Sequence, residues 1–222
     1  RLSLLKKFEK GNIRIYGKYL DDRTAAYMPM PIAVSGSDSN PDYSSLNNYD
    51  ILTGALQSSN FKNDVTLGAN GQILKSDIRD GMHSVSKAVG LEFNYDLGAN
   101  WKVDAKARYA ANDGQFLAPF PAAVGSKAEI LESVAGYGSA VYAGTNTAVD
   151  SNAKYMKTVL FNTTLNNMNN FFSDVNLSKK WDKVKMNAGI YNSSQNINLS
   201  WNWNTYLMEV SDNNARLVDI VS

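Results

Sequence analysis

Hydrophobic and polar residues alternate most regularly between Val89 and Tyr109. The alternation is interrupted by Gly98-Ala99-Asn100 and then resumes. If those three residues form the turn of a hairpin, Glu92 faces Lys106 across the two strands. A period of two with matched cross-strand partners predicts a β-hairpin with one apolar and one charged face.

Two further hairpins are predicted, one on each side of the first. One joins Leu2–Phe8 to Ile13–Leu20, and we expect Gly11 to supply the positive φ of its tight turn. The other joins Phe171–Trp181 to Val184–Tyr191 through a short turn at residues 182–183. In both hairpins the apolar residues share one face: Leu4, Phe8, Ile13, Ile15 and Tyr19 in one, and Phe171, Val175, Leu177, Trp181, Val184, Met186, Ala188 and Ile190 in the other.

A few lysines do not fit these two-faced patterns. Lys6 and Lys179 fall on the apolar faces, and Lys180 faces Lys185 across the last turn. We expect water at the polar rim to solvate them, since long lysine side chains reach outward from apolar surfaces.

Longer segments of weak periodicity, Asp21–Val85, Asn112–Asn167 and Asn192–Ser222, separate and follow the hairpins. They are predicted to be mainly loops with local structure. The local elements expected in them are a short helix or strand at Ile51–Leu56, a helix at Ser126–Ala135, a strand at Tyr155–Leu165, and short strands or a helix near Tyr206–Val210.

The hairpins and long segments together predict an all-β, antiparallel, up-and-down transmembrane β-barrel segment. Because strand direction inverts at every connection, the short turns lie on one side and the long, extracellular loops on the other. From Trp101 to Tyr109 the strand covers roughly 26 Å, or ~19 Å of the membrane normal when tilted. Tyr95, Trp101 and Trp181 near the turns and Tyr109 at the other end fit two interfacial aromatic girdles.

Composition narrows the choice of class. The 222 residues carry a formal net charge of +1, no cysteine and a single histidine, His83. No clustered basic field is present, which argues against nucleic acid as a partner. The mean hydropathy of −0.33 is compatible with a barrel, in which only alternate strand residues face lipid. No apolar run reaches the length of a membrane helix, about 18 residues.

The segment from Gly17 to Pro31, GKYLDDRTAAYMPMP, resembles the barrel of bacterial TonB-dependent outer-membrane receptors, as a strand that runs up into an extracellular loop. The stretches Gly189–Tyr191 and Trp201–Leu207 are similar to the same family. The resemblance spans most of the chain, although it concerns barrel segments and no catalytic signature.

The resemblance implies a barrel of about 22 strands that encloses a plug domain. It implies energy-coupled uptake of a scarce ligand (a siderophore, vitamin or oligosaccharide) across the bacterial outer membrane. The expected partners are the lipid bilayer, the plug of the same parent chain, a TonB-type coupling protein and an extracellular small ligand. Residues 1–222 lack a plug and supply only about six strands, so we expect them to be an internal fragment of the barrel domain.

Candidate ligand-binding residues lie where the strands are predicted to leave the barrel. They are Asp21, Asp22, Arg23, Tyr27, Asp113, Gln115, Phe116, Trp201, Asn202, Trp203 and Asn204. The charged trio at 21–23 is also explained as a self-neutralised strand end. Tyr27 with Pro29 and Pro31 forms either a stiff aromatic lip or a loop that the prolines merely shape. The two tryptophans with nearby amides suit sugar stacking, or interfacial anchoring.

Other chemistries are not supported by the sequence. No metal site, cofactor site or catalytic constellation is predicted, because His83 has no second histidine or cysteine near it in the sequence and is expected to be solvated. The chain is therefore not expected to be an enzyme. A passive porin or structural barrel, and a soluble carbohydrate-binding β protein, remain as alternative functions.

Overall fold

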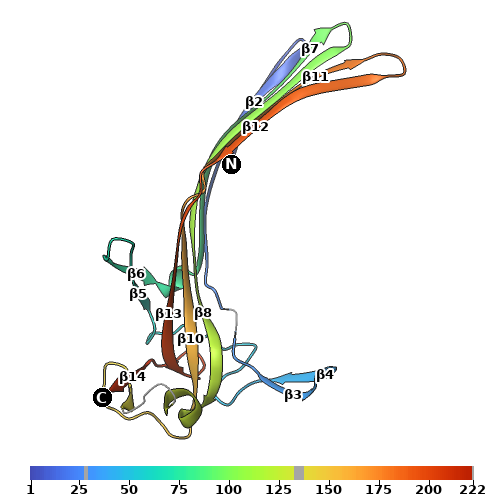
Figure 1. Cartoon of the computed structure of the whole chain (residues 1–222). Coiled ribbons are helices and arrows are strands. Elements are labelled where there is room, and N and C mark those ends of the chain that lie inside the picture. Colours follow the sequence, from blue (N-terminus) through green and yellow to red (C-terminus); the bar gives the residue numbers. More distant parts are fainter. Residues whose placement is uncertain (28–29, 133–137, 222) are drawn as a thin grey trace. The chain divides into compact units, whose positions relative to one another are not determined.

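The structure is a computed structural model that describes residues 1–27, 30–132 and 138–221. Strand accounts for 68% of the structure and helix for 4%. The paired strands run antiparallel, which confirms the predicted all-β class. The chain divides into two compact units, and Figure 1 labels strands from both. Unit 1 contains Arg1–Asp22, His83–Gly114 and Thr164–Ser200; unit 2 contains Arg23–Met82, Gln115–Thr163 and Trp201–Ser222.

Unit 1 is a single antiparallel sheet built from the three predicted hairpins. Its strand order is β1-β2-β7-β8-β11-β12. Among the described residues β1 and β12 are its edges, so the sheet is open. The bounds of the strands are Leu2–Phe8 (β1), Gly11–Thr24 (β2), Met82–Gly98 (β7), Trp101–Ser126 (β8), Asn170–Lys180 (β11) and Lys185–Gln195 (β12).

The first hairpin has the predicted faces but a tighter turn. Leu4 lies opposite Ile15 and Phe8 opposite Gly11, so only residues 9–10 turn the chain. The predicted positive φ at Gly11 is wrong, since its φ lies outside the left-handed range. The glycine is needed for another reason: a Cβ there would lie 2.1 Å from the carbonyl oxygen of Asn94.

The other two hairpins turn where the sequence predicts. Gly98, Ala99 and Asn100 have φ of 86°, 50° and 64°, the left-handed region that Gly and Asn tolerate best. In the last hairpin Val175 lies opposite Ile190, and Lys180 opposite Lys185, as expected.

The sheet of unit 1 has an apolar face that no described segment covers. Val175 and Ile190, which are partners, keep 47% and 77% of their surface exposed. The same face carries Val89, Leu97 and Tyr109, all exposed. Alternate positions carry charged and amide side chains, because successive residues of a strand point to opposite faces.

Unit 2 shows that the predicted long loops are largely wrong. β8 continues to Ser126, and Asn198–Glu209 forms one strand, β13, where only short strands or a helix near Tyr206–Val210 were expected. The predicted strand at Tyr155–Leu165 is confirmed as part of β10 (Lys154–Asn167). The other elements are β3 (Ala33–Ser37), β4 (Asn40–Ser44), β5 (Asn63–Leu67), β6 (Ile73–Asp77), a 3-10 turn η1 (Ile78–Asp80), a π-helical turn η2 (Ala128–Glu132), β9 (Ser139–Tyr142) and β14 (Val218–Val221).

Two local elements expected in these segments are absent or shorter than predicted. Ile51–Thr53 is a turn, without a helix or strand. The helix expected at Ser126–Ala135 is reduced to η2, and residues 133–135 of that prediction lie outside the described residues. The turn at residues 51–53 is held by Asp50, whose carboxylate accepts hydrogen bonds from the backbone N–H groups of Leu52 and Thr53.

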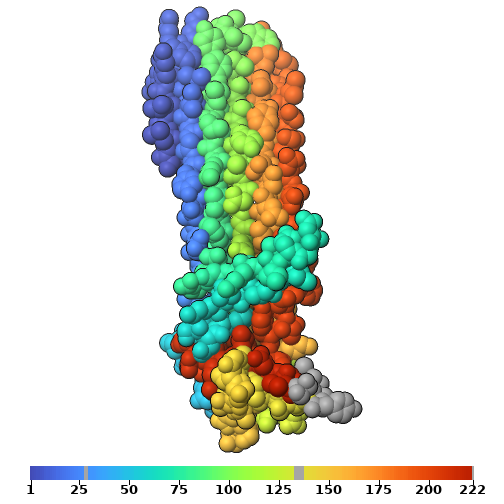
Figure 2. Space-filling model, turned by 90° about the vertical axis from the view of Figure 1, so that its left-hand side faces the viewer, coloured from blue at the N-terminus to red at the C-terminus, as the bar shows by residue number. Residues whose placement is uncertain are grey.

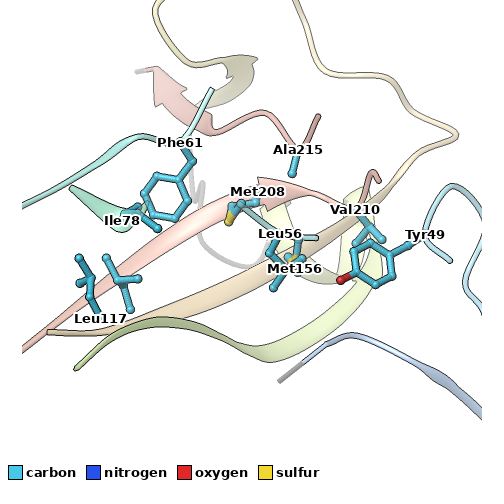
Figure 3. Close-up of a cluster of buried hydrophobic side chains, with 10 residues drawn as sticks. Tyr49, Leu56, Phe61, Ile78, Leu117, Met156, Met208, Val210 and Ala215 are labelled. Carbon is cyan, nitrogen blue, oxygen red and sulfur yellow. The ribbon is translucent and has the colours of Figure 1, made fainter. Parts of the chain in front are cut away.

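A hydrophobic core holds unit 2 together. Tyr49, Leu56 and Phe61 from the connecting segments pack against strand residues such as Leu160 and Met208, as Figure 3 shows for most of the cluster. Figure 2 shows the β5–β6 hairpin (teal) lying across the strands of this unit. Burying such side chains contributes about 1.5–3 kcal/mol each. The core therefore stabilises these segments although their sequences show only weak periodicity.

Candidate functional site

Three of the four aromatic candidates meet on one face of unit 2. Strands β8, β10 and β13 are neighbours in one sheet. A continuous row of rings crosses them: Phe116 and Phe120 of β8, Phe161 of β10, and Trp203 and Trp201 of β13. The ring centroids are 6.2 Å apart for Phe116–Phe120 and 4.7 Å for Phe120–Phe161. They are 5.4 Å apart for Phe161–Trp203 and 5.5 Å for Trp203–Trp201. Trp201 and Trp203 remain 58% and 60% exposed. We call these five residues the aromatic row.

The amides expected beside the tryptophans lie on the other face. Asn202 and Asn204 alternate with Trp201 and Trp203 along β13, and strand alternation turns them away from the row. Asn204 donates a hydrogen bond to Asp64 Oδ1 at 2.5 Å and another to the Val65 carbonyl oxygen at 2.9 Å. The row can therefore stack against a ligand, but the amide of Asn204 already donates its hydrogen bonds within the protein.

Asp64 is the centre of a buried hydrogen-bond network. It is fully buried, and its carboxylate accepts from Asn162 at 2.7 Å, from Tyr206 at 2.7 Å and from Asn204. The candidate Gln115 joins through Asn162, donating to its Oδ1 at 3.1 Å. Burial, with the Asp64 hydrogen bond, raises the pKa of Tyr206, so its hydroxyl remains a donor. These groups fix the β5–β6 hairpin to β8, β10 and β13.

The charged trio at 21–23 does not neutralise itself. Asp21 is bonded to His83 Nε2 at 2.8 Å and to the Tyr19 hydroxyl at 3.1 Å. Arg23 forms its ion pair with Asp80 at 2.9 Å. Asp22 is exposed. His83, which was expected to be solvated, is half-buried and bonded to Asp21, because β2 and β7 are neighbours in the sheet although the two residues are far apart in the sequence.

The remaining candidates are dispersed. Tyr27 is 56% exposed and Pro31 is buried, while Pro29 lies outside the described residues. Asp113 lies near enough to the Tyr19 hydroxyl to interact with it electrostatically. Asp113 and Tyr27 therefore do not join the aromatic row or the Asp64 network.

One ion-pair cluster had no sequence signal. Arg216 donates from Nε and Nη2 to the Glu209 carboxylate at 2.8 and 2.9 Å, and its guanidinium lies 3.4 Å from the Tyr142 ring centroid. The Tyr142 hydroxyl donates to Glu209 at 3.0 Å. The Glu209 hydrogen bonds raise the pKa of Arg216. Tyr142 thus joins β9 to the end of β13 through both partners of the ion pair, so the cluster stabilises the fold and needs no ligand.

The apolar face of unit 1 ends in aromatic residues near its short turns. Phe8, Phe93 and Tyr95 form mutual ring contacts at 5.9–6.3 Å. Lys179, which the pattern places on this face, lies 4.7 Å from the Trp101 ring centroid and 5.2 Å from that of Trp181. Two cation–π contacts thus explain a lysine that interrupts the pattern.

Tyr19 and Tyr109 mark the opposite end of the apolar face. Both are exposed and line an apolar groove with Leu2 and Val89. Beyond them come polar groups, including the Asp21–His83 pair. The apolar face is thus bounded at both ends by aromatic residues.

Within residues 1–27, 30–132 and 138–221, no group of three or more His, Asp or Glu side chains could hold a metal ion. No helix in the described part of the chain has the length and apolarity to span a membrane.

A scan against protein-family models and searches of curated proteins and of solved structures returned no match. The function of the chain is therefore inferred from the chemistry of its two units.

Proposed function

We propose that this chain forms part of the wall of a bacterial outer-membrane β-barrel that takes part in TonB-dependent uptake of a scarce ligand. The observation that carries the proposal is the uncovered apolar face of unit 1, opposite a charged and amide face. A sheet with these two faces is stable when hydrocarbon covers the apolar face and water covers the polar face.

The lengths of the strands support the proposal. Transmembrane strands need about 9–11 residues, and β7 and β8 have 17 and 26. Strands of this length are long enough to cross a bilayer and to continue beyond it. The aromatic residues at both ends of the apolar face are in the positions that interfacial girdles occupy.

The uptake function is supported by the resemblance of residues 17–31 to TonB-dependent receptors. In such a protein the polar face of unit 1 would line the lumen or contact the plug of the parent chain. Unit 2 would be extracellular, and its aromatic row would offer a stacking surface to a ligand. The energy would come from a TonB-type partner through the parent chain.

The membrane part of the proposal is tested with two adjacent residues of β12. Ile190 and Tyr191 are 77% and 66% exposed and lie on opposite faces. In water either arginine variant would be tolerated. In a bilayer, Ile190→Arg should cost about 2–4 kcal/mol, because arginine on the lipid face is costly near the midplane, whereas Tyr191→Arg should cost little.

The measurement is the free energy of folding into phosphatidylcholine vesicles, obtained by urea titration of the chain with its parent barrel domain. Equal effects of the two variants would contradict the proposed membrane face.

A soluble carbohydrate-binding protein is the second candidate function, and the exposed tryptophan pair of the aromatic row favours it. That function requires the chain to be monomeric without detergent. Sedimentation of the purified chain in detergent-free buffer distinguishes the two candidates, since an uncovered apolar face of this kind predicts aggregation.

A further inference from the structure

The polar face of unit 1 is not uniform in charge. One row across the strands is self-compensated: Arg14 forms an ion pair with Glu92 at 2.5 Å, and Asp174 lies directly opposite Lys106. Lys106 also lies close enough to Glu92 to interact with it electrostatically. Positive and negative groups therefore alternate along this row.

Next to it is a pocket of about 480 Å³ in which the charges are not compensated. Lys18 and Arg108 line it together with Tyr16, Phe172 and Arg1, whose guanidinium lies 5.7 Å from the Tyr16 ring centroid. Among the described residues, no carboxylate lies within ion-pair distance of Lys18 or Arg108. The one acid in the lining, Glu92, is already bonded to Arg14.

Aromatic rings form part of the lining of the same pocket. Phe172 is the cross-strand partner of Arg108, whose guanidinium lies 5.7 Å from the ring centroid. The Tyr16 ring lies over Gly90, where an added Cβ would come within 2.3 Å of it. Glycine at position 90 therefore gives the ring room to lie against β7.

We propose that this pocket binds an oxyanion, a carboxylate or phosphate, carried on a flat apolar body. Lys18 and Arg108 would contact the anionic groups, and Arg108 offers a planar guanidinium suited to two parallel hydrogen bonds. Tyr16 and Phe172 would contact the apolar body. The site lies entirely in unit 1 and does not depend on what covers the apolar face.

The test uses 1,3,5-benzenetricarboxylate as the probe and isothermal titration calorimetry at low salt, in detergent if the chain requires it. The unmodified chain should bind this probe more tightly than citrate, which lacks a ring, and should not bind 1,3,5-tris(hydroxymethyl)benzene, which lacks charge. Arg108→Gln and Lys18→Gln should each weaken binding about fivefold or more, the loss of about 1 kcal/mol. Arg108→Lys should retain part of the affinity.

Lys102→Gln is the matched control, because it removes one charge from the same face of β8 outside the pocket. It should change the dissociation constant less than about twofold. No binding of the tricarboxylate, equal binding of citrate, or equal weakening by Lys102→Gln would overturn the proposed site. Circular dichroism of each variant confirms that the sheet is retained.

Discussion

At the scale of single residues, the two glycines of β2, Gly11 and Gly17, differ in how much room they leave for a side chain. A Cβ at Gly11 would lie 2.1 Å from a backbone oxygen, whereas one at Gly17 would meet its nearest atom, the Ala88 carbonyl oxygen, at 3.9 Å. We expect Gly11→Ala to lower the free energy of unfolding by about 2 kcal/mol or more, because a backbone atom must move. Gly17→Ala should raise it by about 0.5 kcal/mol, since glycine weakens strand interiors.

Urea unfolding of both variants measures this difference. A Gly11→Ala protein as stable as the unmodified chain would show that β2 and β7 do not approach as closely as the structure has them.

Asp77 provides a residue-scale prediction about pH. Hydrogen bonds from the Arg79 side chain, then from its backbone N–H, lower the pKa of Asp77 from 3.8 to about 2. A carboxyl whose pKa is depressed on folding stabilises the protein above its unfolded pKa, and this contribution is lost as the pH falls from about 4 toward 2. Because Arg79 is largely exposed, we expect the stabilising effect to be small.

The pKa of Asp77 can be followed by carbon-detected NMR across that range. Arg79→Gln should raise it toward the ordinary value for aspartate, and Asp50, whose pKa is lowered mainly by backbone N–H groups, should not change. An unchanged Asp77 titration in Arg79→Gln would contradict the assignment.

At the scale of elements, the β5–β6 hairpin depends on Asp64. In Asp64→Asn, one carboxylate oxygen becomes an NH₂ group that faces donors from Asn162, Asn204 or Tyr206. Leaving buried donors unpaired costs about 1–3 kcal/mol each, so we expect a loss of about 2 kcal/mol in unfolding free energy and faster amide exchange in β5 and β6. Hydrogen exchange measured by mass spectrometry reports both.

Asp182→Asn is the control for that variant, because Asp182 is exposed at the last short turn. It should change the free energy of unfolding by less than about 0.5 kcal/mol. Amide exchange in β5 and β6 should stay as in the unmodified chain. Unchanged exchange in β5 and β6 of Asp64→Asn would mean that the hydrophobic core alone holds the hairpin.

The elements also show what the sequence could predict. The three hairpins and their faces were predictable because each strand alternates with a period of two and each turn carries its own signal, such as Gly98 and Asn100. Most of β13 was missed because Asn198–Glu209 mixes amides with aromatic residues, and the polar Asn204 is half-buried through its hydrogen bond to Asp64. The folded segments of unit 2 were missed because their core forms between distant segments, such as Tyr49 and Met208.

The candidate site was predictable only in part. Aromatic residues two positions apart in an extended strand share a face, so the pairing of Trp201 with Trp203 followed from the sequence. Their contact with Phe161 and Phe116 requires knowledge of which strands are neighbours. The same is true of His83 with Asp21 and of Arg216 with Glu209, which have no local sequence signature.

At the scale of the whole molecule, the central claim is that lipid covers the apolar face of unit 1 and water the polar face. Val175 and Asn176 test it most directly, because they are consecutive in β11 and point to opposite faces. The chain has no cysteine, so Val175→Cys and Asn176→Cys each carry one spin label.

The decisive measurement is the collision rate of each label with molecular oxygen, which concentrates in lipid, and with a water-soluble nickel chelate, for the barrel domain in phospholipid vesicles. We expect the label at position 175 to collide mainly with oxygen and the label at 176 mainly with nickel. Equal, nickel-dominated collision rates at both positions would place both faces in water and contradict the account.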